Sequence, residues 1–173
     1  MKENVNITFT FITVWVIFKI KELEVAIIKF RDENRFLSNF WPCQVLFEDI
    51  VYPSSEHAYQ AIKSLDKHVR LEIASLRTAG DAKRRGYKIT LRPDWEDVKI
   101  RKMYQICLAK FTQNSHLKDK LLKTYTTELI EGNTWHDNFW GDCSCEKCKN
   151  IKGQNNLGKI LMYIRDNLQL EDF

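Results

Sequence analysis

The chain has 173 residues, which is enough for one domain with a single buried core. Its hydrophobic share of 44% excludes general disorder, and a net charge of +4 is too small for a dedicated nucleic-acid arm, although it suits an anionic ligand. Five cysteines, three of them between residues 143 and 148, do not fit the even, spread pattern of a secreted disulfide framework. A reducing, cytoplasmic setting is expected.

An apolar run, VNITFTFITVWVIFKI, occupies residues 5–20. It is shorter than the ~20 apolar residues of a membrane-spanning helix, contains Asn6 and three threonines, and lacks a small-residue cleavage site. An extra strand, a membrane anchor and an extension outside the domain are open interpretations. We favour the extension, so we predict a domain over residues 24–173 preceded by an extension over 1–23, without stable membrane association.

The following segments predict a small β element and then helices. Residues 25–30, VAIIKF, predict a strand, and residues 43–53 predict a hairpin that turns at Glu48 and Asp49. Helices are predicted at residues 54–65, 68–76, 79–86, 93–111, 115–124 and 156–168. The predicted fold class is α+β: a single, mostly α-helical domain with a small β element near the N-terminus.

Terminal residues and apolar spacing define these helices. Gly86 is predicted to close the helix over 79–86 as its C′ residue, and Pro93 is predicted in the first turn of the helix over 93–111. Buried stripes are predicted at Ala58, Ala61, Ile62 and Leu65 in the first helix, at Trp95, Val98, Met103, Cys107 and Phe111 in the longest, and at Leu157, Ile160, Leu161, Ile164 and Leu168 in the last.

The first helix also has a polar face. Glu56, Gln60 and Lys63 stand at i, i+4 and i+7, so they share one side of the helix. This face is either solvated, with a Glu56–Gln60 contact, or it lines a cleft. His57 is either a ligand contact or a satisfied, partly buried histidine.

Aromatic rings alternate with short polar side chains in EGNTWHDNFWGDC, residues 131–143. Rings stack on bases and sugars, and a carboxylate such as Asp137 can stabilise the oxocarbenium-like transition state of N-glycoside cleavage. The alternative is an aromatic corner packed on the last helix. FLSNFWP, residues 36–42, repeats this composition around Ser38 and Asn39.

Basic residues follow in AKRRGYKITLR, residues 82–92, which suits either a phosphate clamp or a solvated helix end. GQNNLG, residues 153–158, leads into the last helix, whose free N–H groups could meet a phosphate.

The segment CSCEKC holds Cys143, Cys145 and Cys148. Three thiolates at this spacing need a fourth zinc ligand, for which His136 and Cys43 are available. The alternative is a reduced surface loop. We predict no cofactor and no metal, and keep the three cysteines as zinc candidates.

Six segments occur in the order found in the NADAR, or YbiA-like, family: FLSNF, SSEHAYQAIK, AKRRG, DWEDVK followed by LAKF, DNFWGD and GQNNLGKILMYIR. The resemblance covers about residues 27–168. It implies a mostly helical α+β fold that cleaves N-glycosidic bonds on ribose phosphates. Some members resemble hydrolases of riboflavin-pathway intermediates, and others remove ADP-ribose from guanine in nucleic acid.

The resemblance implies catalytic roles for Glu56, Lys63 and Asp137. Together with the polar helix face and the FLSNF segment, it predicts substrate contacts at Phe36, Ser38, Asn39, His57, Gln60, Arg84, Trp140 and Asn155. Two departures stand out: CSCEKCKNIKGQ replaces a glycine-rich stretch, and Tyr87 occupies a position that is often basic.

The predicted activity is hydrolysis of the bond between a base and a ribose phosphate. Asp137 or Glu56 would orient water and stabilise the cationic sugar, while Lys63 would hold a phosphate or hydroxyl, or form a Schiff base with an opened ribose. The expected partner is a small ribose-phosphate or ADP-ribosyl substrate, with ADP-ribosylated nucleic acid as the alternative. A non-catalytic ADP-ribose or nucleotide-binding module is the competing hypothesis.

Overall fold

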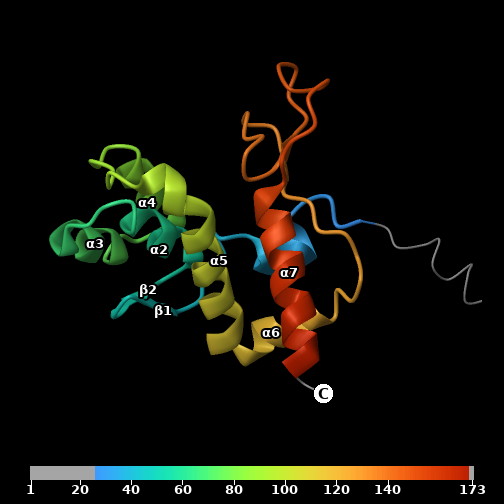
Figure 1. Ribbon diagram of the computed structural model, residues 1–173, viewed down its shortest axis with the longest axis horizontal. Helices are drawn as coiled ribbons and strands as arrows, with labels where there is room; N and C mark the ends of the chain where they lie inside the picture. The colour runs from blue at the N-terminus through green and yellow to red at the C-terminus, as the bar shows by residue number, and fades with distance from the viewer. Residues whose placement is uncertain (1–25, 172–173) are drawn as a thin grey trace, which may run out of the picture.

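The computed structural model describes residues 26–171 (Figure 1). The apolar run at residues 5–20 and the rest of the predicted extension lie outside these described residues. Two groups of helices make up the body. Helices α2 (Ser55–Ala61), α3 (Lys67–Ala74) and α4 (Ala79–Gly86) pack together on one side. The long α5 (Trp95–Gln113) runs through the middle, and α7 (Asn156–Glu171) packs against α5 on the other side (Figure 1).

The elements follow one another in this order: η1 Asp32–Leu37, β1 Val45–Phe47, β2 Ile50–Tyr52, α2 Ser55–Ala61, α3 Lys67–Ala74, α4 Ala79–Gly86, α5 Trp95–Gln113, α6 Ser115–Leu122, β3 Gly132–Asn133, β4 Asp142–Cys143 and α7 Asn156–Glu171. Strands β1 and β2 pair antiparallel, and β3 and β4 pair parallel. The predicted fold class is confirmed. Within residues 26–171, no helix is both long and apolar enough to cross a membrane.

The predicted hairpin is confirmed. Val45 pairs with Tyr52 across β1 and β2, and the turn residues Glu48 and Asp49 both have positive φ, of 46° and 63°. Two consecutive residues with positive φ match the twist of a tight hairpin. Gln113 at the end of α5 exchanges two hydrogen bonds with the backbone of Leu46, which ties the hairpin to the core.

The predicted strand over residues 25–30 is wrong. Among the described residues of that segment, only Ile27 makes a β-bridge, in parallel with Leu129. Ile27 bonds on both sides of that partner, to Glu128 and Ile130. The pairing stops there because the chain then turns into η1. The paired stretch is therefore too short to form a strand, despite the β-branched residues of this segment.

The helix stripes form the core largely as predicted. All five predicted positions in α5 and all five in α7 are buried. In the first helix, however, Leu65 is 62% exposed. The reason is that α2 ends at Ala61 with Ile62 as its C-cap, so Leu65 no longer follows the helical spacing. The prediction of Pro93 in the first turn of the longest helix is wrong, because α5 begins at Trp95 with Asp94 as its N-cap.

Gly86 is not the C′ residue that was predicted. It is the last residue of α4, it lacks a positive φ, and Tyr87 is the C-cap. A Cβ at Gly86 would stand 1.9 Å from Oε1 of Gln60. The glycine therefore allows α4 to approach α2 closely, at the point where α2 presents its polar face.

Candidate active site

A cavity of about 860 Å³ lies where α2, α4 and the start of α5 meet the loop between β3 and β4. Seven of the predicted site residues line it, namely Ser38, Asn39, Glu56, Gln60, Lys63, Asp137 and Trp140. Segments about 100 residues apart in the chain thus contribute to one hollow. The polar face of the first predicted helix lines a cleft rather than facing solvent.

The FLSNF segment sets the start of α2. The backbone carbonyl of Asn39 accepts a hydrogen bond from the N–H of Glu56 at 3.0 Å, and the Ser54 hydroxyl caps the helix by accepting from the N–H of His57. The buried ammonium of Lys110 supports the segment from below by donating to the carbonyls of Phe36 and Ser38, at 2.5 and 2.9 Å. These bonds fix where Glu56 enters the cavity.

Glu56 is a buried carboxyl group, only 6% exposed. Burial raises its pKa, against the opposing effect of a hydrogen bond that Gln60 Nε2 donates to Oε1 at 2.7 Å. The other amide atom, Gln60 Oε1, is buried without a hydrogen-bond partner in the described chain. A buried carboxyl with a raised pKa is suited to exchanging a proton with a bound ligand.

The ammonium group of Lys63 is surrounded by aromatic rings. Its Nζ lies 5.5 Å from the ring centre of Tyr59, 5.7 Å from Tyr87 and 5.8 Å from Trp95. Burial lowers the pKa of Lys63 and nearby Lys83 lowers it further, whereas Glu56 acts in the opposite direction. A lysine with a lowered pKa is a better nucleophile because more of it is neutral.

Asp137 both builds the loop and lines the cavity. Its Oδ1 accepts hydrogen bonds from the backbone N–H groups of Phe139 and Trp140, at 3.1 and 2.8 Å. The Asn133 side chain in turn accepts from the N–H of Asp137 and donates to its carbonyl. The short polar side chains of this loop therefore hydrogen-bond to the loop backbone, which has little regular secondary structure to satisfy its polar groups.

Glu131 is a cavity residue that was not anticipated from the sequence. Burial and the nearby charge of Asp137 raise its pKa to about 7, and its Oε2 is buried without a partner in the described chain. The Asn155 side chain fixes the backbone here, since its Oδ1 accepts from the N–H of Glu131 at 3.0 Å. Only the position of Glu131 at the start of the aromatic stretch could have indicated it.

Two tryptophans of the loop play different structural parts. Trp140 is packed edge-on against the rings of Tyr59 and Phe139, with ring centres 5.4 and 4.9 Å apart, so it forms a wall. Trp135 is 49% exposed, with Arg31 and Lys83 near its ring at 5.7 and 5.9 Å. Trp135 is therefore the ring available for stacking at the cavity mouth.

Besides Lys63, four basic side chains line the same cavity: Arg31, Arg35, Lys83 and Lys99. Of the basic residues predicted as a phosphate clamp, Lys83 faces the cavity and Arg84 does not. The Arg84 side chain is 70% exposed and pairs with Asp81 at 2.5 Å on the outside of α4. The cavity thus combines internal acids with a basic rim.

Four predicted substrate contacts do not line the cavity. Phe36 is buried in the core, and Arg84 points outward. His57 is held by Ser54 Oγ at 2.7 Å and the Leu76 carbonyl at 3.1 Å, which makes it the satisfied histidine of the alternative interpretation. Asn155 uses its amide to bond the backbone of Glu131 and Leu129. These four residues therefore lie where they support the surrounding structure, and they do not face the cavity.

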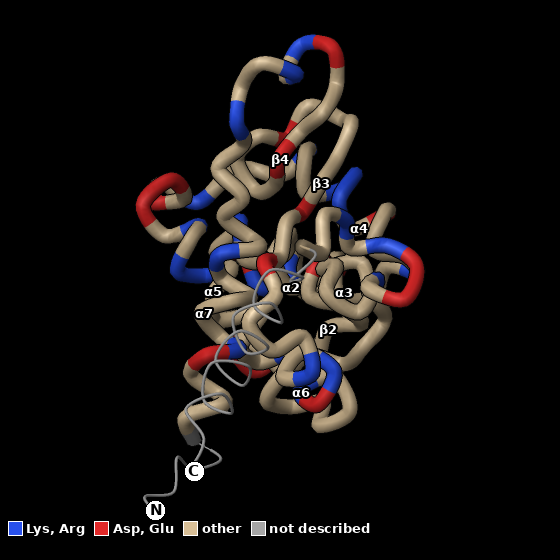
Figure 2. The backbone as a smooth tube through the Cα atoms, turned by 90° about the vertical axis from the view of Figure 1, so that its right-hand side faces the viewer, with Lys and Arg blue, Asp and Glu red and all other residues tan. Residues whose placement is uncertain are grey.

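A second groove of about 650 Å³ adjoins the cavity. Arg31 and Gly132 line both hollows, and Lys29, Lys149 and Lys152 add positive charge to the second. The segment after β4 that carries two of these lysines projects beyond the helices (Figure 2). Together the hollows form a longer, basic surface beside the cavity.

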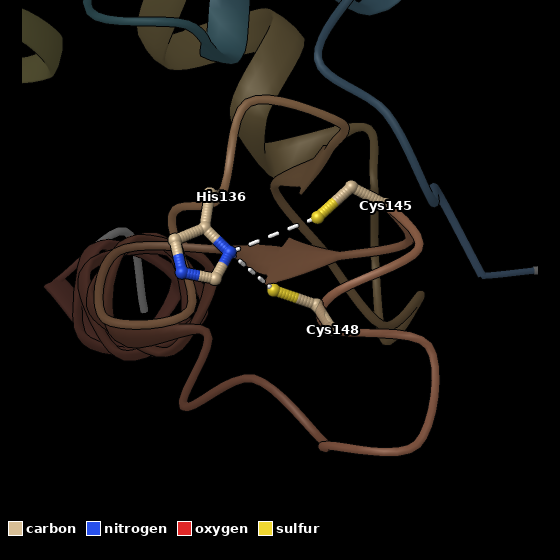
Figure 3. Close-up of side chains that lie close together, drawn as sticks. All are labelled: His136, Cys145 and Cys148. Atoms are coloured by element: carbon tan, nitrogen blue, oxygen red, sulfur yellow. Dashed lines mark hydrogen bonds between the residues drawn. The ribbon is translucent and has the colours of Figure 1, made fainter.

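A cluster of potential metal ligands joins the loop between β3 and β4 to the segment after β4. His136, Cys145 and Cys148 place their ligand atoms within 4.8 Å of one another (Figure 3). Cys43, the other fourth ligand considered from the sequence, is not in this group. It lies at the start of the hairpin segment and packs against the hydrophobic core.

The NADAR domain family model matches residues 28–169 of the chain. The protein therefore belongs to the NADAR family, as the six ordered segments predicted.

The chain is also similar to individual family members. It is 38% identical over 144 residues to the N-glycosidase YbiA of Escherichia coli, across 81% of this chain and 85% of that protein. It is 40% identical over 141 residues to the riboflavin biosynthesis protein VVA0006 of Vibrio vulnificus, but it spans only 37% of that protein's length. The NMR structure of E. coli YbiA matches with a TM-score of 0.72 at 35% identity, covering 85% of this chain and 87% of that one. The prediction of a YbiA-like N-glycosidase homologue is confirmed.

Proposed function

We propose that this protein hydrolyses the N-glycosidic bond between a base and a ribose phosphate. The observation that carries the proposal is the convergence of Glu56, Lys63 and Asp137 on one cavity with a basic rim. Membership of a family that includes N-glycosidases supports the same reaction class. The rim suits the phosphate, the inner acids suit proton transfer, and the exposed Trp135 ring suits the base.

The simplest route uses two carboxyl groups. Protonated Glu56 donates its proton to the leaving base as the bond between C1 and nitrogen breaks, and the developing cationic sugar is stabilised by Asp137. Water then adds to C1 and returns a proton to Glu56. The raised pKa of Glu56 supports its role as the acid, because more of it is protonated near neutral pH.

The second route uses Lys63. Its neutral amine attacks C1 of the opened ribose, the base leaves as a free amine, and the resulting imine is hydrolysed by water. The lowered pKa and the aromatic surroundings of Lys63 support this route. The two routes differ in one testable respect, because only the second forms a covalent bond to the protein.

The preferred substrate is a small ribosylamino-pyrimidine phosphate of the riboflavin-intermediate type. The similarity to a riboflavin biosynthesis protein supports this class, although the chain spans a minor part of that relative. A cavity of about 860 Å³ is of the size that encloses a small ligand.

ADP-ribosyl-guanine in nucleic acid is the second candidate. The adjoining basic groove favours it, because a longer ligand would extend from the cavity past Arg31 toward Lys149 and Lys152. This substrate would use the same cleavage chemistry, with the nucleic acid remaining outside the cavity.

The experiment offers both substrates in parallel to the purified protein and follows release by mass spectrometry. We expect free pyrimidine from the small substrate and loss of release in Glu56→Ala and Asp137→Ala. Release of ADP-ribose alone would shift the function to nucleic-acid de-modification. Binding of ADP-ribose without turnover of either substrate would contradict the proposed enzyme and identify the protein as a binding module.

A further inference from the structure

We propose that His136, Cys143, Cys145 and Cys148 bind one structural zinc ion. All five cysteines of the chain are free thiols, so none of these three is engaged in a disulfide. Three cysteines and one histidine are a common ligand set for structural zinc, and thiolate ligands select zinc over magnesium or calcium. The site lies apart from the cavity chemistry and does not depend on the proposed reaction.

The distances between ligand atoms in the cluster are close to those of a zinc site. His136 Nδ1 lies 2.9 Å from Cys148 Sγ and 3.7 Å from Cys145 Sγ (Figure 3). In a tetrahedral zinc site, bonds of about 2.3 Å to sulfur and 2.0 Å to nitrogen separate the ligand atoms by roughly 3.5–3.8 Å. Small side-chain adjustments therefore suffice for these three atoms.

We assign the fourth position to Cys143, which lies outside the group of three within 4.8 Å but contacts the backbone of two of its members. Its sulfur accepts backbone N–H groups from His136 at 3.2 Å and from Cys145 at 3.4 Å, which are two of the other three ligand residues. N–H donors directed at a sulfur stabilise a thiolate, the form in which cysteine binds zinc. Cys143 is also fixed by β4, where it pairs with Asn133 of β3.

The backbone at His136 supports the same conclusion. His136 has a φ of 68°, a conformation that is uncommon for a residue with a side chain. Its ring points toward Cys145 and Cys148, although the loop that carries it is separate from the cysteine turn (Figure 3). The loop therefore adopts an unfavourable conformation at the residue that completes the ligand set.

A metal here would hold the cavity wall. The two strands beside it are two residues long, and the chain from residue 144 to residue 155 has no helix or strand. His136 immediately precedes Asp137, and Asn138 accepts the N–H of Cys143 at 2.8 Å. Zinc would thus link the irregular segment after β4 to the loop that carries Asp137 and Trp140.

The test measures metal content of the full chain produced with zinc and then dialysed against metal-free buffer. Elemental analysis should find about one zinc per chain. The double variant Cys145→Ser/Cys148→Ser should lose it, while the matched variant Cys43→Ser, outside the cluster, should retain it. Cobalt exchanged into the wild-type protein should show thiolate charge-transfer absorption and tetrahedral bands, a readout that needs no variant to fold.

Three results would overturn the proposal. They are wild-type protein that takes up no stoichiometric zinc or cobalt, a double variant with unchanged metal content, and a metal-free protein in which Cys145 and Cys148 form a disulfide. Because these readouts are independent of turnover, an inactive protein that holds zinc would contradict the proposed function alone. A metal-free protein that turns over substrate would contradict the zinc site alone.

Discussion

The surroundings of Lys63 and Glu56 shift the pKa values of the two residues in opposite directions. One is an amine among three aromatic rings, and the other is a carboxyl beneath the surface with one amide donor. In both cases removal from water disfavours the charged form, which moves the two pKa values toward neutrality from opposite sides. Both shifts have the direction that the proposed acid and the proposed nucleophile require.

Substitution of Lys63 separates its two proposed roles. We expect Lys63→Met to lower kcat by roughly 100-fold or more, since the variant loses either a charge or a nucleophile. Lys63→Arg should restore turnover if the lysine only binds a phosphate or hydroxyl, and should not if it forms an imine. Borohydride trapping followed by mass spectrometry checks the imine, and Lys67→Met, on the exposed side of α3, is the control. Wild-type activity in Lys63→Met would remove this residue from the mechanism.

Glu131 should make stability depend on pH. Its folded-state pKa of about 7 lies above the ordinary value of 4.5, so the folded protein keeps a proton that the unfolded chain has lost. The free energy of unfolding should therefore fall as the pH rises from about 4.5 through 7. The difference in free energy of unfolding between Glu131→Gln and wild type should therefore shift in favour of the variant by roughly 1–3 kcal/mol when the pH is raised from 5 to 8. Urea unfolding at both pH values checks this, and parallel pH profiles would contradict it.

Glu56 and Gln60 could be predicted together because helical spacing puts them on one side of α2, and Lys63, two residues beyond the end of that helix, lines the same cavity. The same spacing explains the error at Arg84. Neighbouring positions on a helix point about 100° apart, so Lys83 faces the cavity while Arg84 pairs with Asp81 outside. Choosing between them requires the packing of α4 on α2, which the local pattern does not contain.

At the scale of elements, the contact between α4 and α2 controls the polar face. Gly86→Ala would bring a Cβ to within 1.9 Å of Gln60 Oε1 and displace the amide that bonds Glu56. We expect a net loss of about 1–2 kcal/mol of stability, together with reduced turnover. Thermal unfolding and kinetics measure the two effects.

Gly80→Ala provides the matched control in the same helix. Its Cβ would meet nothing closer than 3.5 Å, so the change should be neutral or stabilise by up to about 1 kcal/mol. Equal effects of the two substitutions would show that helix propensity, rather than the contact with Gln60, determines the result.

Helices and the hairpin could be predicted because their signals are local. The spacing in α5 and α7 and the turn at Glu48 and Asp49 each lie within one segment. The strand predicted over 25–30 failed because a strand needs a partner segment, and among the described residues Ile27 pairs only with Leu129, about 100 residues later. The two short strands that hold the loop escaped prediction for the same reason.

For the whole molecule, the cavity is formed by distant parts of the chain. The segment around Asn39, the helix α2 and the loop at Asp137 line one cavity, and α5 packs against both α2 and α7. The sequence supplied these residues, partly through the family resemblance. The hollow they enclose and its lining by Glu131 required the assembled fold.

The predicted boundary near residue 24 can be tested by truncation. Removing residues 1–23 retains Ile27, which bridges Leu129, and the family match from residue 28 onward. We expect the shortened chain to keep the melting temperature and turnover of the full chain within experimental error. Differential scanning calorimetry and kinetics check this, and loss of cooperative unfolding would assign the first residues to the domain.

The central claim is that the cavity around Glu56 cleaves an N-glycosidic bond. The most direct measurement follows release of the free pyrimidine from its ribosylamino 5-phosphate by wild type, by Glu56→Gln and by Glu72→Gln, a control whose carboxylate pairs with Arg85 on the surface. We predict release by wild type and the control, and a loss of roughly 100-fold or more in Glu56→Gln. Equal release by all three proteins would contradict the account.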